Sequence, residues 1–310
     1  MKQVYSRDDI SSLFHLPLKQ LVLRAQEMHQ KFHKEKPLER CSLLSVKTGN
    51  CPEDCAYCAQ SCRYKTHVTP HNFLDKKVVL DLAKKAKEEN STYFCLATAG
   101  REVKESRDFE LLLEMVREIA SLGLKVCVSL GFLDETRAKK LKEAGVFSYN
   151  HNIDTSPGYY KKIITTHRFE ERLETIAWVK KANLSICCGG ILGMGESAQD
   201  RIDFLHYLTQ IQPDSVPLNA LVIAPGTPLE HATPIPFFDL LRIIAVLRLV
   251  LPQATLRLAG GRSRFSLAEQ LLAFTVGIGG VHVGEKLLVL PNCSVKEDLY
   301  FLDLLEKELR

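Results

Sequence analysis

Short apolar runs alternate with longer amphipathic segments along almost the whole chain. Eight of the short runs are predicted to be β-strands, because apolar and β-branched residues fill them and turn-forming residues flank them. These runs cover residues 42–47, 93–97, 125–129, 147–152, 184–189, 215–222, 255–258 and 280–283. The hydrophobic pattern therefore predicts eight strands spread over the length of the chain.

The segments between the strands repeat their apolar residues with the period of an α-helix. In residues 106–122 the apolar side chains share one face, and Gly123 follows as a stop signal. Ser197 and Asp200 have the spacing of a capping box at the start of another helix. Similar patterns fill residues 17–34, 134–144, 169–181, 236–251 and 267–276.

This alternation favours a parallel sheet closed as a (β/α)8 TIM-type barrel with an N-terminal helical extension. An open, doubly wound sheet stays the alternative, because periodicity does not show closure. No linker or internal repeat marks a domain boundary. We therefore expect a single domain over residues 1–310, with helical residues 1–40, a barrel at 41–285 and a C-terminal segment at 286–310.

Composition fits a globular enzyme and argues against several other classes. Of the 310 residues, 45% are hydrophobic and 25% are charged, and the net charge is +4. Basic residues are scattered along helices, so nucleic acid is not indicated, and no apolar run approaches the roughly eighteen residues of a membrane span. The N-terminus, MKQVYSRDD, has no apolar signal region. A cytoplasmic location is expected, where thiols stay reduced.

Three of the ten cysteines, Cys51, Cys55 and Cys58, follow the first predicted strand with C-x3-C-x2-C spacing. Three thiolates on one loop can hold three corners of a cubic iron–sulfur cluster and leave its fourth iron open to a small molecule. A zinc site is the alternative, although Cys62 or His67 would have to supply its fourth ligand at an unusual spacing. A disulfide loop is disfavoured in a reducing compartment.

Four polar residues fall inside other predicted strands, where a barrel normally has branched apolar side chains. Cys95, Cys127 and Cys187 lie in the second, third and fifth strands, and Arg257 lies in the seventh. Each cysteine alone is typical of a small buried hydrophobe. Arg257 needs an anion or several acceptors, for example a cluster or a ligand carboxylate. Spacing alone does not show that the four residues converge.

Other polar residues stand near strand ends. Asn150, Asn152 and Asp154 close the fourth strand and suit ribose hydroxyls or an amide-like substrate, or alternatively a capping turn. Asn219 is a strand amide that must be hydrogen-bonded. Arg172 lies on a helix, where it would either bind a carboxylate or be exposed without a role.

On these motifs the chain resembles the biotin synthase family of radical-SAM enzymes over nearly its whole length. The matching segments are KTGNCPEDC at 47–55, YNHNIDTS at 149–156, IITT at 163–166, CCGGILGMGE at 187–196 and LRLAGGR at 256–262. The cysteine spacing is shared by radical-SAM enzymes in general, whereas the other segments are specific to biotin synthases.

The resemblance implies the last step of biotin biosynthesis, in which sulfur is inserted into dethiobiotin. By resemblance, the ligands of a 4Fe-4S cluster that cleaves S-adenosylmethionine are Cys51, Cys55 and Cys58. The ligands of a sulfur-donating 2Fe-2S cluster are Cys95, Cys127, Cys187 and Arg257. Contacts to S-adenosylmethionine are implied for Tyr57, Asn152, Asp154 and Arg172, and contacts to dethiobiotin for Asn150, Asn152 and Asn219.

No side chain is expected to act as an acid or base, because unactivated C–H bonds require a radical from the cofactor. A homodimer and an electron donor such as flavodoxin or ferredoxin are implied by resemblance alone. No family role matches Cys41, Cys62, Cys188 or Cys293. Residues 287–292 are mostly apolar, where some family members have threonines near the substrate carboxylate.

Two other function classes stay open on the sequence alone. A different radical-SAM reaction would not need Cys95, Cys127, Cys187 and Arg257 together. A non-catalytic iron–sulfur sensor or zinc module would not need polar groups at so many strand ends. The four strand residues and the polar strand ends therefore favour the sulfur-insertion reading.

Overall fold

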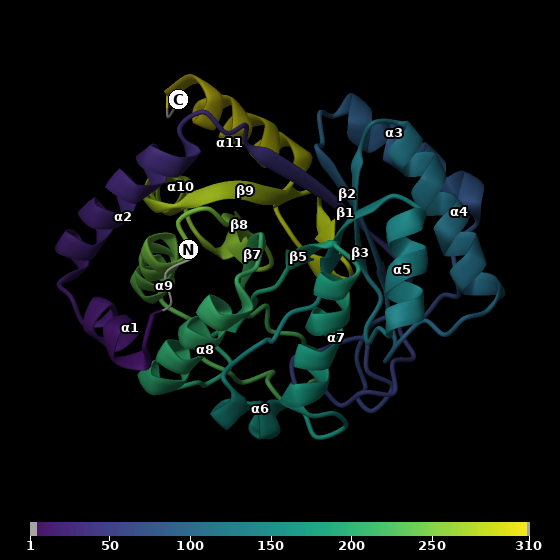
Figure 1. Ribbon diagram of the computed structural model, residues 1–310, viewed down its shortest axis with the longest axis horizontal. Coiled ribbons are helices and arrows are strands. Elements are labelled where there is room, and N and C mark those ends of the chain that lie inside the picture. The colour runs from purple at the N-terminus through teal and green to yellow at the C-terminus, as the bar shows by residue number, and fades with distance from the viewer. Residues whose placement is uncertain (1–4, 309–310) are drawn as a thin grey trace.

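The computed structural model describes residues 5–308 and shows parallel strands surrounded by helices (Figure 1). The barrel strands are β1 (Glu39–Lys47), β2 (Tyr93–Thr98), β3 (Lys125–Ser129), β4 (Val146–Asn150), β5 (Ser185–Cys187), β7 (Ser215–Ala220), β8 (Thr255–Leu258) and β9 (Ile278–Val283). The β1–β9 and β5–β7 pairings close the sheet. The predicted barrel is confirmed, and the open doubly wound alternative is wrong.

Helices cover the outer face of the barrel. They are α3 (Lys76–Glu88), α4 (Arg107–Ser121), α5 (Glu135–Glu143), α6 (Pro157–Ile163), α7 (Phe169–Lys181), α8 (Ala198–Ile211), α9 (Phe237–Val250) and α10 (Leu267–Val276). The predicted capping box of α8 is present, because Ser197 and Asp200 each accept a hydrogen bond from the other's backbone N–H. No described helix is both long and apolar enough to cross a membrane.

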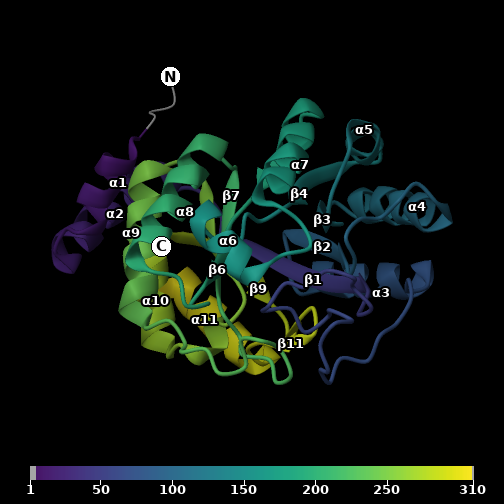
Figure 2. The ribbon, with the colours of Figure 1, turned by 90° about the horizontal axis from the view of Figure 1, so that it is seen from below.

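The two ends of the chain add helices to this barrel. Helices α1 (Arg7–Phe14) and α2 (Leu18–His33) lie beside α8 and α9, on the side away from α3 and α4 (Figure 2). After β9 come a small hairpin of β10 (Lys286–Leu287) and β11 (Leu290–Pro291) and helix α11 (Val295–Glu308). A buried ion pair between Arg262, in η1 (Arg262–Arg264), and Asp298 holds α11 in place.

The first strand begins at Glu39, ahead of the predicted residue 42, because residues 39–42 pair with β9. Alternate residues of β1 serve the two sides of the sheet. Leu44 and Val46 pack in the main core, between the sheet and the helices. Cys41 and Leu43 pack instead with a separate buried cluster inside the barrel that includes Cys95.

The fifth strand is interrupted where the sequence pattern predicted one run over 184–189. It splits into β5 and β6 (Gly190–Leu192), and both segments pair with β7. Cys187 pairs with Ser215 and Gly190 pairs with Leu218, so Gly189 lies opposite Pro217. Proline has no N–H to complete the ladder at this point. The break lets two backbones approach closely beside Cys187.

Candidate active site

The triple-cysteine loop follows β1 and folds back on itself. Backbone hydrogen bonds join Cys51 N to Gln60 O at 3.0 Å, Cys62 N to Cys51 O at 2.8 Å, and Cys58 N to Cys55 O at 2.9 Å. Cys55 is buried, and Cys51 and Cys58 are partly exposed. Burial raises the pKa of all three thiols, that of Cys58 to about 11. Metal binding at this loop would therefore displace protons.

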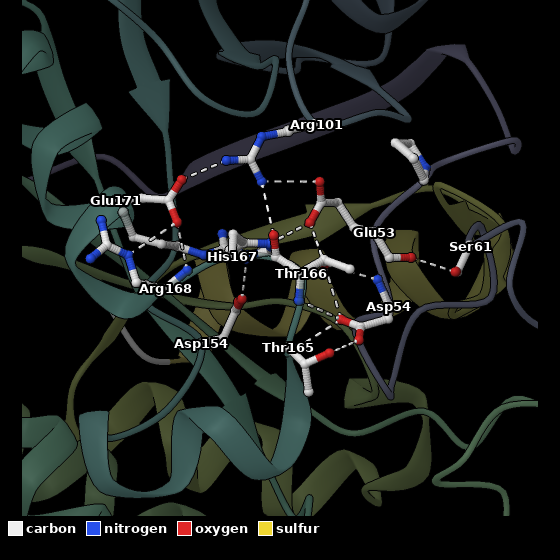
Figure 3. A network of polar contacts seen from close by, with 12 residues as sticks. Glu53, Asp54, Ser61, Arg101, Asp154, Thr165, Thr166, His167, Arg168 and Glu171 are labelled. Atoms are coloured by element: carbon white, nitrogen blue, oxygen red, sulfur yellow. Dashed lines mark hydrogen bonds and ion pairs between the residues drawn. The ribbon is translucent and has the colours of Figure 1, made fainter.

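Two adjacent carboxylates of this loop, Glu53 and Asp54, contact the segment after α6 (Figure 3). Glu53 lies 2.5 Å from His167 Nδ1 and accepts a hydrogen bond from Arg101 at 3.2 Å. Asp54 accepts a hydrogen bond from the backbone N–H of Thr165 at 2.9 Å. None of these residues was predicted as part of the site. The sequence did show two carboxylates, Glu53 and Asp54, inside the cysteine motif. It did not show their partners, which lie far away along the chain.

Arg101 joins a third segment to the same network. It follows β2, and its second terminal nitrogen donates to Glu171 near the start of α7 at 2.5 Å. Its guanidinium carbon lies 4.7 Å from the centre of the Phe132 ring. The cysteine loop is thus held against segments that follow β2, β3 and β4.

Tyr57, Asp154 and Arg172, predicted from separate parts of the sequence, form one cluster. The Tyr57 hydroxyl donates to Asp154 Oδ2 at 2.7 Å, and Arg172 forms an ion pair with the same oxygen at 2.7 Å. Asp154 is buried and has a left-handed φ of 62°, a conformation that Asp tolerates better than most residues. Burial and then the Asp154 charge raise the pKa of Tyr57, so its phenol stays a neutral donor.

Most donors of Arg172 are already used. Besides the Asp154 ion pair, Arg172 Nε donates to the Tyr160 hydroxyl at 2.7 Å, and a terminal nitrogen donates to the Asn152 carbonyl at 3.0 Å. The other terminal nitrogen lies 3.2 Å from His167 Nε2. A guanidinium has five N–H donors, so contacts with the described residues leave one of them for an external carboxylate.

The four predicted interior residues converge. Cys95 and Cys127 are direct neighbours in the β2–β3 register and pack in one buried cluster, and Cys187 is close enough to Cys127 to affect its pKa. Arg257 donates to the Cys187 sulfur at 3.5 Å. All four side chains are buried. The hydrogen bonds from Cys187 and Cys95 lower the pKa of Cys127, which favours a thiolate at that position.

The buried guanidinium of Arg257 has a protein carboxylate as its partner. Its Nε and one terminal nitrogen donate to the same oxygen of Glu39 at 2.9 and 2.7 Å. The Tyr93 ring lies 4.5 Å from the guanidinium carbon. The expected partner was a cluster or a ligand carboxylate. Glu39 supplies the negative charge, and it lies in the part of β1 that the sequence pattern did not predict. The other terminal nitrogen of Arg257 faces Cys187.

Asn150 connects the interior thiols to the cluster around Asp154. Its Nδ2 lies 3.2 Å from the Cys187 sulfur and 3.3 Å from Asn152 Oδ1. The Asn152 carbonyl in turn accepts from Arg172, which is paired with Asp154. A continuous chain of polar contacts therefore runs from the cysteine loop, through the residues after β4, to the barrel interior.

The Asn219 side chain is hydrogen-bonded to backbone at both its nitrogen and its oxygen, as expected for a strand amide. Its Nδ2 donates to Gly190 O at 3.1 Å, and its Oδ1 accepts from Gly260 N at 2.9 Å. His151, in the same motif as Asn150, was not predicted as a site residue. Its buried Nε2 has no hydrogen-bond partner among residues 5–308. A buried nitrogen without a partner is typical of a place where a ligand or water completes the structure.

The donor sets suit clusters better than a single ion. Within the described residues, no three Cys, His, Asp or Glu side chains are arranged to hold one metal ion. One set consists of three thiols on a loop, and the other of three thiols with an arginine. Thiolate sulfur is a soft ligand that favours iron–sulfur clusters, Cu(I) and zinc. The residues present therefore fit two iron–sulfur clusters.

Two families match successive parts of the chain. Residues 45–208 match the Radical SAM superfamily, and residues 217–307 match the Biotin and Thiamin Synthesis associated domain. Strands from both parts form the one closed barrel. A biotin synthase of Cytophaga hutchinsonii is 42% identical, covering 99% of this chain and 91% of that protein. One of Sorangium cellulosum is 47% identical, covering 93% and 83%.

The solved structures add evidence on the fold. Methylornithine synthase (PylB) superimposes with a TM-score of 0.82 at 19% identity, covering 98% of this chain and 94% of that chain. At this identity the likeness concerns the barrel alone. The family matches and the sequence identity to curated relatives decide the remaining question: the chain belongs to the biotin synthase family of radical SAM enzymes.

Proposed function

We propose that the chain forms biotin by inserting sulfur into dethiobiotin. The observation that carries this proposal is the convergence of Cys95, Cys127, Cys187 and Arg257 in the barrel interior, apart from the cysteine loop. Cleavage of S-adenosylmethionine needs the loop thiols only. A second buried set of thiols gives the barrel a place from which sulfur can reach a substrate.

The radical SAM family implies S-adenosylmethionine and a 4Fe-4S cluster. The side chains that would hold this cluster are Cys51, Cys55 and Cys58. Those that would hold a 2Fe-2S cluster are Cys95, Cys127, Cys187 and Arg257. When bound, these groups supply radical chemistry and the sulfur atom of the product, which no side chain provides.

The chain's own residues would bind and orient S-adenosylmethionine and dethiobiotin, and would keep water out of the site. Asp154 and Tyr57, which lie in hydrogen-bonding contact with each other, would bind ribose hydroxyls, and Arg172 would donate its remaining N–H to a carboxylate. Asn150 and Asn219 offer amide groups that match the donors and acceptors of a cyclic urea. Asp154 is 3% exposed and Cys187 is 2% exposed, so reacting atoms between them would be shielded from solvent.

An anaerobic single-turnover assay with dethiobiotin, S-adenosylmethionine and a chemical reductant tests this function. The unsubstituted chain should form biotin and 5′-deoxyadenosine. Cys58→Ala should abolish both products, because it removes a loop thiol. Cys95→Ala should abolish biotin while 5′-deoxyadenosine still forms, because it affects only the interior set.

Two results would contradict the proposal. The first is normal biotin formation by Cys95→Ala, which would show that a cluster held by the interior thiols is not the sulfur source. The second is an unsubstituted chain that reconstitutes one 4Fe-4S cluster with no 2Fe-2S absorption. Cys62→Ala is the matched control, because Cys62 is an exposed thiol next to the same loop and should leave both products unchanged.

Three further proposals rest on family resemblance. The electron donor is a flavodoxin or ferredoxin, the chain acts as a homodimer, and it works in the cytoplasm. Each has a direct measurement: reduction kinetics with the purified donor, sedimentation of the reconstituted protein, and cell fractionation.

A further inference from the structure

A fifth thiol, Cys41, lies among the proposed interior ligands. It is completely buried and packs with Tyr93, Cys95 and Cys127 in a cluster separate from the main core. The neighbouring thiols of Cys127 and Cys41 raise the pKa of Cys95. Cys41 is therefore part of the same buried cluster as two of the proposed ligands, Cys95 and Cys127.

Strand register explains why Cys41 points into the barrel. On β1, Cys41 pairs with Tyr93 of β2, and Leu43 pairs with Cys95. Residues two positions apart on a strand share a face, so Cys41 lies one layer from Cys95 toward the start of the strands. Diagonal neighbours on adjacent strands are within reach of each other. The shared position of the two cysteines in one cluster thus follows from the register of the sheet.

The layer of Cys41 also contains an unsatisfied nitrogen. His282 lies directly opposite Cys41 in the β1–β9 register. Its Nδ1 is buried and has no hydrogen-bond partner in the described part of the chain. Cys127 and Arg257 are close enough to act electrostatically on His282. A buried, unpaired imidazole nitrogen beside a thiol is a second sign that a ligand belongs here.

A small buried hydrophobe is the ordinary role of an isolated cysteine. Cys41 differs because its neighbours include two of the proposed ligands, and because Arg257 lies within electrostatic reach of its sulfur. By contrast, Cys188 is just as buried but packs in the main core on the other side of the sheet. Position in the barrel, rather than burial, separates the two thiols.

We propose that Cys41 is a reserve ligand of the interior cluster and can replace Cys95 at its iron. The inference rests on the proposed function, since it presupposes a 2Fe-2S cluster in the barrel. One iron–sulfur bond forms at Cys41 as the bond at Cys95 breaks. The Cys41 proton passes to the Cys95 sulfur, which belongs to the same buried cluster, and no electron is transferred.

Such an exchange has a use in a protein whose cluster gives up sulfur. Loss of a bridging sulfide leaves iron with fewer ligands, and a neighbouring thiol can retain that iron until the cluster is rebuilt. Because of this exchange, a substitution can affect iron content and biotin formation differently. A cluster held by Cys41 would lie one layer deeper, so Cys95→Ala is expected to keep iron and yet lose biotin formation.

The test counts interior clusters by Mössbauer spectroscopy after anaerobic reconstitution with labelled iron and sulfide. The variants are Cys95→Ala, Cys41→Ala, Cys95→Ala with Cys41→Ala, and Cys95→Ala with Cys293→Ala. Cys293 is a buried thiol that has no contact with the interior cluster of residues, so it provides the matched control. Far-UV circular dichroism checks that each variant keeps the barrel.

We expect Cys41→Ala to keep the full 2Fe-2S signal, and Cys95→Ala to keep at least about half of it, with or without Cys293→Ala. The Cys41 and Cys95 double variant should fall below about a tenth of the signal. A Cys95→Ala protein that is folded but as empty as this double variant would overturn the inference. An unsubstituted chain with no 2Fe-2S signal would overturn the proposed function as well.

A second measurement does not depend on Cys95→Ala folding. A chelator should remove the interior iron of Cys41→Ala at least about threefold faster than that of Cys293→Ala, because the released iron has lost its alternative thiol. Equal rates of iron loss in the two single variants would overturn the reserve-ligand role, even if both proteins form biotin.

Discussion

The Asp154 carboxylate joins three parts of the site. It lies after β4, accepts from Tyr57 of the cysteine loop, and neutralises Arg172 on α7. The side chains of Asp154 and Arg172 are 4% and 13% exposed, so their pairing takes place largely out of water. Removing one partner of a buried ion pair leaves the other charge uncompensated, which costs about 3–5 kcal/mol.

Asp154→Asn should therefore lower the free energy of unfolding by about 3 kcal/mol, because Arg172 would lose its counter-charge. Formation of 5′-deoxyadenosine should fall at least about tenfold, because Tyr57 and Arg172 would no longer be held together. Urea denaturation and the anaerobic assay measure the two effects. Asp239→Asn is the control, since its pair with Arg201 is half exposed at the carboxylate and should matter little. Equal losses in both variants would contradict this role.

Arg257 and Glu39 allow a second test at the scale of single residues. Arg257→Met should destabilise the fold by about 3 kcal/mol, because Glu39 would keep a charge without its partner. Adding Glu39→Gln should restore part of that loss. A double-mutant cycle from urea denaturation measures the coupling. Strictly additive effects would show that the pair does not stabilise the folded state.

The sequence predicted some of these residues and not others, for a physical reason. Cys95, Cys127 and Cys187 stand inside strongly apolar runs, so the strand pattern exposed them as exceptions. Glu39 and Cys41 stand in a polar stretch that has no strand pattern of its own. Residues 39–42 become part of β1 because they pair with β9, and Cys41 and Ser42 pair with β2 as well. That pairing joins residues that lie far apart in the sequence, so a local pattern does not reveal it.

The break between β5 and β6 is a secondary-structure feature that the local sequence pattern also did not predict. Two glycines follow Cys188 in the sequence, but the cause of the break lies on another strand, where Pro217 faces Gly189. The interruption frees Gly189 N to donate to Asn152 Oδ1 at 3.0 Å. An irregular strand thus helps to orient an amide of the site.

Gly189→Ala should destabilise the barrel by about 2–4 kcal/mol, because its Cβ would lie 2.0 Å from the Pro217 carbonyl oxygen and backbone would have to move. Thermal unfolding measures the loss. Gly279→Ala, on β9, is the matched control: the nearest atom to its Cβ, in Thr255, is 3.6 Å away, an ordinary contact. A Gly189→Ala protein as stable as this control would show that the close approach is not required.

Arg248 connects the barrel to the N-terminal helix α2. Arg248 is completely buried and donates to the carbonyls of Ala254 and Gly277 at 2.9 and 2.6 Å. A terminal nitrogen of Arg248 also lies 2.7 Å from His33 Nε2, on α2, which in turn lies 3.0 Å from the Pro252 carbonyl oxygen. The arginine joins the N-terminal helices to the turn before β8 and the start of β9. Burial beside the Arg248 charge favours a neutral imidazole at His33 in the folded chain.

Burial and then the Arg248 charge lower the pKa of His33 to about 3 and that of His29, stacked on it, to about 4. Both histidines titrate near their ordinary value of 6.5 when the chain unfolds. The unfolded chain therefore binds more protons between these limits, and folding stability falls as pH is lowered from about 6.5 toward 3. Above pH 6.5 the contribution is complete.

We accordingly expect the urea midpoint to fall steadily between pH 6.5 and pH 4. His33→Gln keeps an acceptor for Arg248 but cannot be protonated, so it should flatten this pH dependence while leaving the midpoint at pH 7 nearly unchanged. His231→Gln is the control, because its side chain is 93% exposed, and its profile should follow the unsubstituted chain. If His33→Gln showed the full loss at low pH, the acid sensitivity would have to come from groups other than His33.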